Sequence, residues 1–178
     1  MTGLGTRQAI YRETVRLPGW VLLVILAIFL ACGSGYLSGR GAVASEAPGM
    51  TWLWDLFWGF SLAVPLLALL LLGRLQLLVR DGSLCVRFGF VAMQVKEIPL
   101  STIERAEVVR YAPIRQFGGW GLRKGMHEGA PTAVYSLRGS SGVLLTLAQP
   151  IPTFFLRTDK VLVGSENPAR LAEVLGGG

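Results

Sequence analysis

The chain begins with two long apolar stretches without a polar face and continues as short segments in which apolar and polar residues alternate. The first stretch, residues 18–37, carries no charge, and the second, residues 51–73, carries only Asp55. Twenty helical residues span about 30 Å, which is the thickness of the hydrocarbon layer of a bilayer. A soluble helix of this length would need a polar face. The pattern therefore predicts transmembrane helices over residues 18–37 and 51–73, joined by a connector over residues 38–50.

From residue 74 onward the alternation predicts about seven or eight antiparallel strands, without the strand–helix–strand order of a parallel nucleotide-binding sheet. Asp81-Gly82 predicts a tight hairpin turn, because glycine tolerates a positive φ, and the Gly-Ser-rich residues 139–142 predict a second hairpin loop. A third turn is expected at Thr158-Asp159. Asn167-Pro168 predicts the start of a terminal amphipathic helix. The strands are expected over residues 75–80, 84–88, 91–97, 104–111, 132–137, 143–148, 153–157 and 160–164.

Basic residues flank the two apolar stretches unevenly. Residues 1–73 carry a net charge of +1 and residues 74–178 a net charge of +5, which make up the formal +6. The connector holds only Arg40, balanced by Glu46, whereas the outer flanks hold Arg7, Arg12, Arg16, Arg74, Arg80 and Arg87. Because basic flanks stay in the cytoplasm, we expect a multi-pass protein of the inner cell membrane. Residues 1–17 and 74–178 would then be cytoplasmic, and the connector would be external.

Two processing signals compete with this topology. Ala42-Val43-Ala44 fits a signal-peptide cleavage site, and residues 30–33 loosely resemble the cleavage site of a bacterial lipoprotein. Either cleavage would leave the second predicted helix crossing the membrane and the C-terminal domain in the cytoplasm. The uncleaved hairpin is favoured, because the first stretch is longer than the apolar region of most signal peptides.

Small residues recur every four positions in the first apolar stretch, which allows close helix packing in lipid. The candidate packing residues are Ala27, Ala31, Gly35 and Gly39 in the first stretch and Gly59 and Ala63 in the second. They predict packing of the two helices within one chain, with homodimerisation as the alternative. Asp55 is interpreted as a charge near the membrane surface that reaches water, and the alternative is an intramembrane carboxylate for protons or ions.

The second half of the chain resembles a bacterial pleckstrin-homology-like (PH-like) domain over about 100 residues. The segments that carry the resemblance are Asp81-Gly82, IPLSTI (residues 98–103), VLLTL (143–147), TDKVLVGS (158–165) and Asn167-Pro168 with the helix after it. The resemblance implies a bent seven-stranded barrel plugged at one end by the C-terminal helix. The fold class expected for the whole chain is a two-helix transmembrane hairpin followed by a mostly-β PH-like barrel with a C-terminal α-helix. The tight first turn lacks the basic cluster of phosphoinositide-binding members, so that site is not carried over.

The Gly-rich segment over residues 112–130 is the most unusual part of this domain. Glycine backbone amides together with basic side chains can hold phosphate, and a tryptophan can enter a membrane interface. Its candidate residues for contact with an anion, a lipid or a partner are Arg115, Gly119, Trp120, Arg123 and Lys124. The alternative is a structural loop whose Trp120 covers the open end of the barrel. A Walker A loop is excluded, because no Gly-Lys-Ser/Thr sequence occurs.

The composition argues against catalysis. Hydrophobic residues make up 52% of the 178 residues, charged residues 16%, and the mean hydropathy is +0.51, which excludes a disordered chain or a disulfide scaffold. His127 is the only histidine, and Cys32 and Cys85 are the only cysteines, so zinc-site patterns are absent. We therefore expect no enzyme, metal or cofactor, and no nucleic-acid partner.

The function expected from the sequence is a non-enzymatic, membrane-anchored interaction module. Its expected partners are the lipid bilayer, with anionic lipid or a protein at the inner membrane face, or a second copy of the chain. The alternative is a structural or accessory subunit of a larger membrane complex, in which the transmembrane hairpin makes the contacts.

Overall fold

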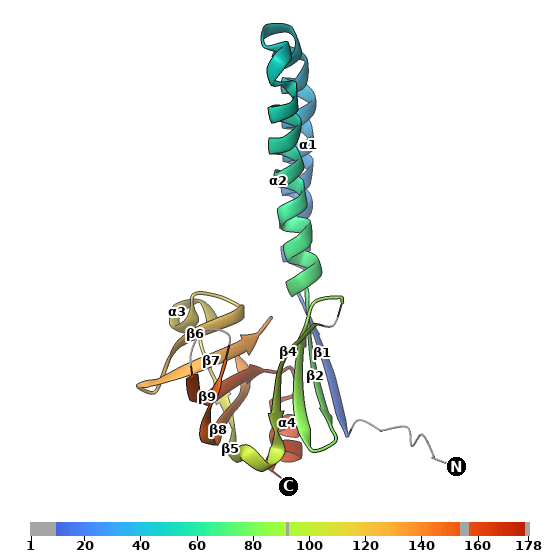
Figure 1. The fold of residues 1–178 in the computed structure, drawn as a ribbon. Coiled ribbons are helices and arrows are strands. Elements are labelled where there is room, and N and C mark those ends of the chain that lie inside the picture. The colour runs from blue at the N-terminus through green and yellow to red at the C-terminus, as the bar shows by residue number, and fades with distance from the viewer. Residues whose placement is uncertain (1–9, 92, 154–156, 177–178) are drawn as a thin grey trace, which may run out of the picture.

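The protein, seen here as a computed structural model, is a long helical hairpin standing on a β-rich domain (Figure 1). The structure describes residues 10–91, 93–153 and 157–176. Helix α1 spans Gly19–Glu46, and helix α2 spans Thr51–Leu72. Both are long and apolar enough to cross a membrane, and neither buries any residue inside the protein. Their apolar surfaces are therefore left for a surrounding apolar medium.

Helix α1 is longer than the sequence predicted. It continues to Glu46, so most of the expected connector is helical, and only Ala47 and the short 3-10 helix η1, Pro48–Met50, separate the two helices. Glycines at positions 39 and 41 disfavour a helix when it is considered alone. Contacts with α2 offset this preference, since Gly39 lies against the ring of Trp54 and Arg40 pairs with Asp55.

The segment before α1 forms a strand that the sequence analysis did not predict. Strand β1, Tyr11–Arg16, pairs antiparallel with β2, Arg74–Arg80, so that Arg16 lies opposite Arg74. The helical hairpin is thus inserted between two paired strands. Consequently the residues on either side of the hairpin, β1 and β2, lie at the same end of it (Figure 1).

The first sheet is a meander in the order β1-β2-β3-β4, with β3 over Ser83–Phe88 and β4 over Met93–Pro99. The predicted hairpin between β2 and β3 is confirmed. Its two turn residues, Asp81 and Gly82, have φ of 52° and 74°, as in the tight turns that match the twist of paired strands.

The second sheet has the order β5-β8-β9-β7-β6. Its strands are β5 (Ile103–Arg110), β6 (Gly121–His127), β7 (Ala130–Ser136), β8 (Ser141–Pro152) and β9 (Arg157–Gly164), and the 3-10 helix η2 (Leu100–Thr102) precedes them. The expectation of purely antiparallel strands is wrong for β7 and β9, which pair in parallel.

Three finer predictions in this sheet also differ from the structure. Residues 139–142 do not form a hairpin, because β9 lies between β7 and β8 in the sheet. The turn predicted at Thr158-Asp159 lies inside β9. The strand predicted over residues 153–157 falls mostly on residues 154–156, which are outside the described part of the chain.

The main core lies between the two sheets, and helix α4, Pro168–Gly176, packs over β5 and β8. The terminal helix is confirmed, and its Leu171 and Leu175 are buried in that core. The described strands form two separate sheets, so the closed barrel implied by the resemblance is not seen.

Glu13 connects the first strand to the end of the second sheet. Its carboxylate accepts hydrogen bonds from the Tyr11 hydroxyl (2.7 Å), the Ser165 hydroxyl (2.6 Å) and the Glu166 backbone N–H (2.5 Å). Burial, together with the hydrogen bond to Glu13, raises the pKa of Tyr11 to about 12. This contact joins segments at opposite ends of the chain into one domain.

Candidate functional site

The Gly-rich segment over residues 112–130 is a short helix and an edge strand, not the long loop that the sequence suggested. Helix α3 spans Pro113–Phe117 and ends at Gly118, whose φ of 72° is left-handed. Strand β6 then pairs with β7 along its full length. The glycines serve this folding, because Gly119 and Gly121 also have positive φ, at 126° and 107°.

The structure brings three of the five candidate residues of this segment together. The Trp120 indole N–H donates to the Gly139 carbonyl (3.1 Å), and Arg123 Nε donates to the Trp120 carbonyl (3.2 Å). A Cβ at Gly119 would lie 3.8 Å from Arg123 Nη2. Gly119, Trp120 and Arg123 therefore form one corner of the domain, next to the hairpin.

The other two candidates lie apart from this corner. Lys124 points to the opposite face of β6 from Arg123, since successive side chains of a strand alternate between faces. The register of β6 and β7 also places Lys124 on the face of the main core, because Lys124 lies opposite Ala133 of that core. Arg115 is exposed on α3 and lines a hollow of about 420 Å³ on the α3 side of Trp120. The five residues are therefore not a single binding loop.

Helix α3 is fixed to the sheet by the ring of Phe117. Phe117 is buried directly over Gly125, where any Cβ would collide with the ring. Its ring centroid lies 6.0 Å from that of Tyr111 and 6.5 Å from that of His127. The histidine is thus part of the packing beneath α3, and its Nδ1 is buried without a hydrogen-bond partner among the described residues.

The turn between β3 and β4 touches the end of α2. The Phe90 backbone N–H donates to the Leu70 carbonyl (2.9 Å), and a Cβ at Gly73 would lie 2.9 Å from the Phe90 ring. Gly89 has a φ of 79° and leaves no room for a side chain, because a Cβ there would lie 2.6 Å from the Leu70 carbonyl oxygen. Phe90 and Val91 are nevertheless 56% and 75% exposed. This apolar turn was not predicted from the sequence, although the consecutive apolar residues that begin at Phe90 are its signal.

Strand pairing also gathers arginines that sequence analysis used only for topology. Arg16 lies opposite Arg74, and Arg87 lies opposite Gln76, two residues further along β2. These three, the membrane-end arginines, share the outer face of the first sheet with Arg12 and Arg80, which lie toward its far end. The Nε of Arg87 is buried and has no acceptor among the described residues. An anion at this end of the sheet would supply one.

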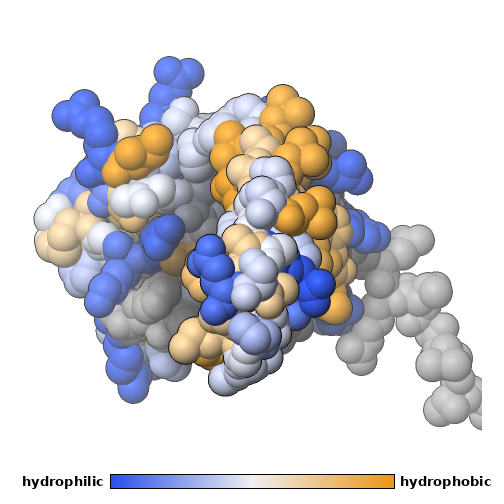
Figure 2. All heavy atoms as spheres, turned by 90° about the horizontal axis from the view of Figure 1, so that it is seen from above, coloured by the Kyte–Doolittle hydropathy of each residue, from blue (hydrophilic) through white to orange (hydrophobic). Residues whose placement is uncertain are grey.

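Figure 2 looks down on the hairpin and shows its apolar side chains next to the hydrophilic side chains of the domain. A smaller apolar group lies on the upper face of the domain, apart from the hairpin. The view from the hairpin side thus shows both apolar and polar side chains.

Within the hairpin, two of the six predicted packing residues lie between the helices. A Cβ at Gly35 would lie 2.7 Å from the Trp58 ring, and one at Gly39 would collide with Trp54. The other four, Ala27, Ala31, Gly59 and Ala63, are exposed. In the structure these two glycines thus lie against tryptophan rings of the facing helix of the same chain.

Asp55 is an ion-paired residue between the two helices. It accepts hydrogen bonds from the Tyr36 hydroxyl (2.8 Å) and from Arg40 Nε (3.1 Å), and the guanidinium of Arg40 lies over the Tyr36 ring. The three side chains connect the helices near the end far from the domain. Asp55 is therefore ion-paired within the chain, and its side chain remains partly exposed.

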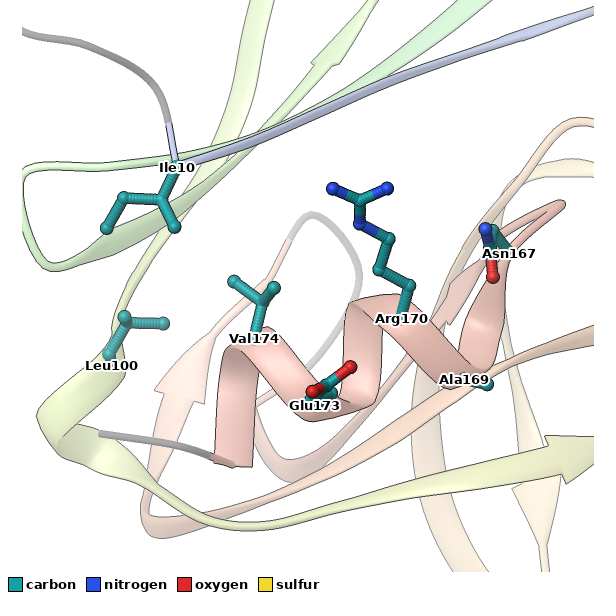
Figure 3. A pocket seen from close by; sticks show the side chains of 7 residues that line it. All are labelled: Ile10, Leu100, Asn167, Ala169, Arg170, Glu173 and Val174. Carbon is teal, nitrogen blue, oxygen red and sulfur yellow. The ribbon is translucent and has the colours of Figure 1, made fainter.

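A hollow of about 1040 Å³ lies beside α4, at the side of the domain away from the hairpin. Arg170 and Val174 of α4 point across it toward the start of β1, and Ile10 and Leu100 lie on the other side (Figure 3). It is open and lined by one cation, Arg170, one carboxylate, Glu173, and the amide Asn167 beside apolar side chains, so its chemistry selects no class of ligand.

The described residues contain no group of three or more His, Cys, Asp and Glu side chains that could hold a metal ion.

The candidate site is the face of the domain toward the hairpin, with its apolar turn, its arginines and the corner at Trp120. No protein-family model, curated protein or solved structure matches the chain.

Proposed function

We propose that the protein is a membrane-anchored, non-enzymatic interaction module whose PH-like domain rests on the inner leaflet of the cell membrane and binds its anionic headgroups. The sequence resemblance, the two sheets and the C-terminal helix support a PH-like domain. The observation that carries the proposal is the hydrogen bond between Phe90 and Leu70, which joins the domain to the last turns of an apolar helix.

This hydrogen bond fixes how close the domain lies to the end of α2, and therefore to the bilayer that α2 would cross. Helix α2 ends at Leu72 and β2 begins at Arg74, while β1 ends at Arg16 and α1 begins at Gly19, so neither connection has room for a linker. With the apolar part of α2 in the bilayer, the exposed Phe90 and Val91 lie at the boundary of the hydrocarbon layer. Burial of the exposed parts of their side chains in lipid would contribute about 1–2 kcal/mol each, less than for fully exposed side chains.

The charges on the domain support the same orientation. Arg16 and Arg74 are the first charged residues outside the apolar helices, and Arg87 lies opposite Gln76, two residues further along β2. Each basic side chain near an anionic surface contributes about 1 kcal/mol. Arg12 lies four residues from Arg16 on the same strand face, about 13 Å further from the helices. Because this separation exceeds the Debye length of about 8 Å, Arg12 should contribute little.

The test uses the full chain reconstituted in bilayers with spin-labelled phosphatidylglycerol or phosphatidylcholine. Electron paramagnetic resonance then measures the fraction of each lipid that the protein immobilises. We expect a preference for the anionic lipid that weakens at 0.5 M salt, by analogy with other surface charge interactions. Exchanging Arg16 and Arg87 for glutamine should reduce the preference about tenfold or more, since two contributions of about 1 kcal/mol are lost.

The matched control is the exchange of Arg12 and Arg80 for glutamine, which removes the same charge from the far end of the same sheet face. It should leave the lipid preference within about twofold. Equal losses in both variants would show that only net charge matters and would refute a specific membrane-facing end. A wild-type protein without any preference for anionic lipid would refute the proposal as a whole.

A second candidate function is a structural subunit of a membrane complex. It is favoured by the exposure of Ala27, Ala31, Gly59 and Ala63, small residues that leave room for another helix. Ala31→Leu with Gly59→Leu would test it, because loss of co-purifying membrane proteins would support this function and unchanged co-purification would contradict it. Gly35 and Gly39 are unsuitable for this test, since they pack within the chain.

A further inference from the structure

A hollow of about 490 Å³ lies between the base of the hairpin and the Trp120 corner of the domain. One wall is helical, with Trp20 and Val21 of α1 and Ala68 and Leu72 of α2. Trp120, Leu137 and Arg123 of the domain line the other wall. The volume falls in the range of about 300–1,000 Å³ that is typical of small-molecule sites.

The position of this hollow limits what can fill it. Its helical wall belongs to the first turns of α1 and the last turns of α2, next to Arg16 and Arg74, the first charged residues outside the apolar helices. With the helices in a bilayer, the hollow therefore opens where acyl chains meet headgroups. A lipid molecule from the leaflet reaches this depth without crossing a polar layer.

The one charged side chain that lines the hollow favours a lipid with a phosphate headgroup. Its walls are apolar, and its only charged side chain among the described residues is that of Arg123. Arg123 Nε is used by the Trp120 carbonyl, which fixes the direction of the guanidinium, while the side chain remains exposed. Guanidinium groups match phosphate oxygens in charge and in hydrogen-bond geometry.

We infer that this hollow binds one glycerophospholipid, with an acyl chain between α2 and Trp120 and the phosphodiester at Arg123. This inference rests on the proposed function, since it requires the domain to face the leaflet. It differs from the general attraction of the membrane-end arginines, which needs no cavity and lies on the other sheet. The occupant is a lipid, and a protein segment or a second copy of the chain would be a contrary result.

The experiment is native mass spectrometry of the full chain extracted from membranes in a mild detergent. We expect one phospholipid retained per chain in the wild-type protein. Ala68→Trp fills the hollow and should lower the occupancy at least fivefold. Val64→Trp is the matched control, because Val64 is 60% exposed on the same helix and does not line the hollow.

A second pair of variants keeps the test independent of helix packing. Arg123→Gln should lower the lipid occupancy at least fivefold, whereas Lys124→Gln on the opposite face of β6 should leave it unchanged. Loss of lipid in both variants would overturn the assignment of the phosphate to Arg123. A wild-type chain that retains no phospholipid, or a dimer or a bound protein in its place, would overturn the inference itself.

The two proposals fail in different ways. Loss of retained lipid in Ala68→Trp, with an unchanged preference for surrounding anionic lipid, is expected if both are right. If the preference for surrounding anionic lipid is kept but no lipid is retained, only the proposed lipid site in the hollow is refuted. A retained lipid without any preference for surrounding anionic lipid refutes the proposed binding of anionic headgroups and leaves only the lipid site in the hollow.

Discussion

Exchange of Glu13 for alanine should detach the N-terminal strand from the second sheet. The carboxylate accepts three hydrogen bonds, from Tyr11 in its own strand and from Ser165 and Glu166 before α4. All three are lost in Glu13→Ala, and the Ser165 hydroxyl, in a residue only 4% exposed, is left without its acceptor. The strand pairing of β1 with β2 remains, so the loss is local to the contact between the sheets.

The size of the effect follows from these hydrogen bonds. Bonds to a charged acceptor contribute about 1.5–3 kcal/mol each when buried, and less when one partner reaches water. Glu13 is half-buried, so we count about 1 kcal/mol for each bond and expect a total loss of about 2–3 kcal/mol. Glu13→Gln keeps one oxygen and the shape of the side chain, and about half of that loss is expected.

Amide hydrogen exchange of the full chain in detergent micelles measures the loss, because it reports the free energy of opening for each segment. Peptides that cover β1 and the residues before α4 should exchange faster in Glu13→Ala, while those of the helical hairpin should not change. Glu104→Ala is the control, since Glu104 is an exposed carboxylate at the start of β5. Exposed substitutions of this kind usually change stability by less than about 0.5 kcal/mol.

The double variant Glu13→Ala with Ser165→Ala isolates the bond between the two sheets. A coupling energy of about 1 kcal/mol between the two substitutions is expected, as for other residues in direct contact. If Glu13→Ala changes the opening of β1 by less than about 0.5 kcal/mol, the argument that this carboxylate joins the sheets is wrong.

Two further outcomes test the packing and the buried tyrosines. Gly35→Leu should separate the hairpin, because a Cβ there already lies 2.7 Å from Trp58, whereas Gly33→Leu meets open space and should not; cross-linking between the helices distinguishes the two. Burial raises the pKa of both Tyr11 and Tyr135 to about 12, while unfolded tyrosines titrate near 10. Stability should therefore be constant up to about pH 10 and fall as the pH rises toward 12, and unfolding measured in pH steps would contradict this if it showed no loss.

Local patterns in the sequence were enough to predict the elements that do not depend on contacts with distant residues. Two long apolar stretches, which carry one charge between them, predict the long helices, because a soluble helix of this length would need a polar face. Asp81-Gly82 predicts its turn from backbone φ alone, and Asn167-Pro168 predicts the start of α4 from helix capping. In each case the signal lies within one continuous segment of the chain, so distant contacts do not change it.

Only the tertiary structure decided which strands pair and which side chains meet. Strand β1 has a polar pattern and becomes a strand because β2, beyond the whole hairpin, offers a partner. The sequence of the Gly-rich segment predicts a loop, but part of it forms strand β6 because β7 pairs with it. In this strand Arg123 and Lys124 point to opposite faces. The hollow at Trp120 depends on the hairpin and the second sheet together. Strand pairing and cavities arise from contacts between distant residues, and a sequence pattern with a period of two or four residues does not contain them.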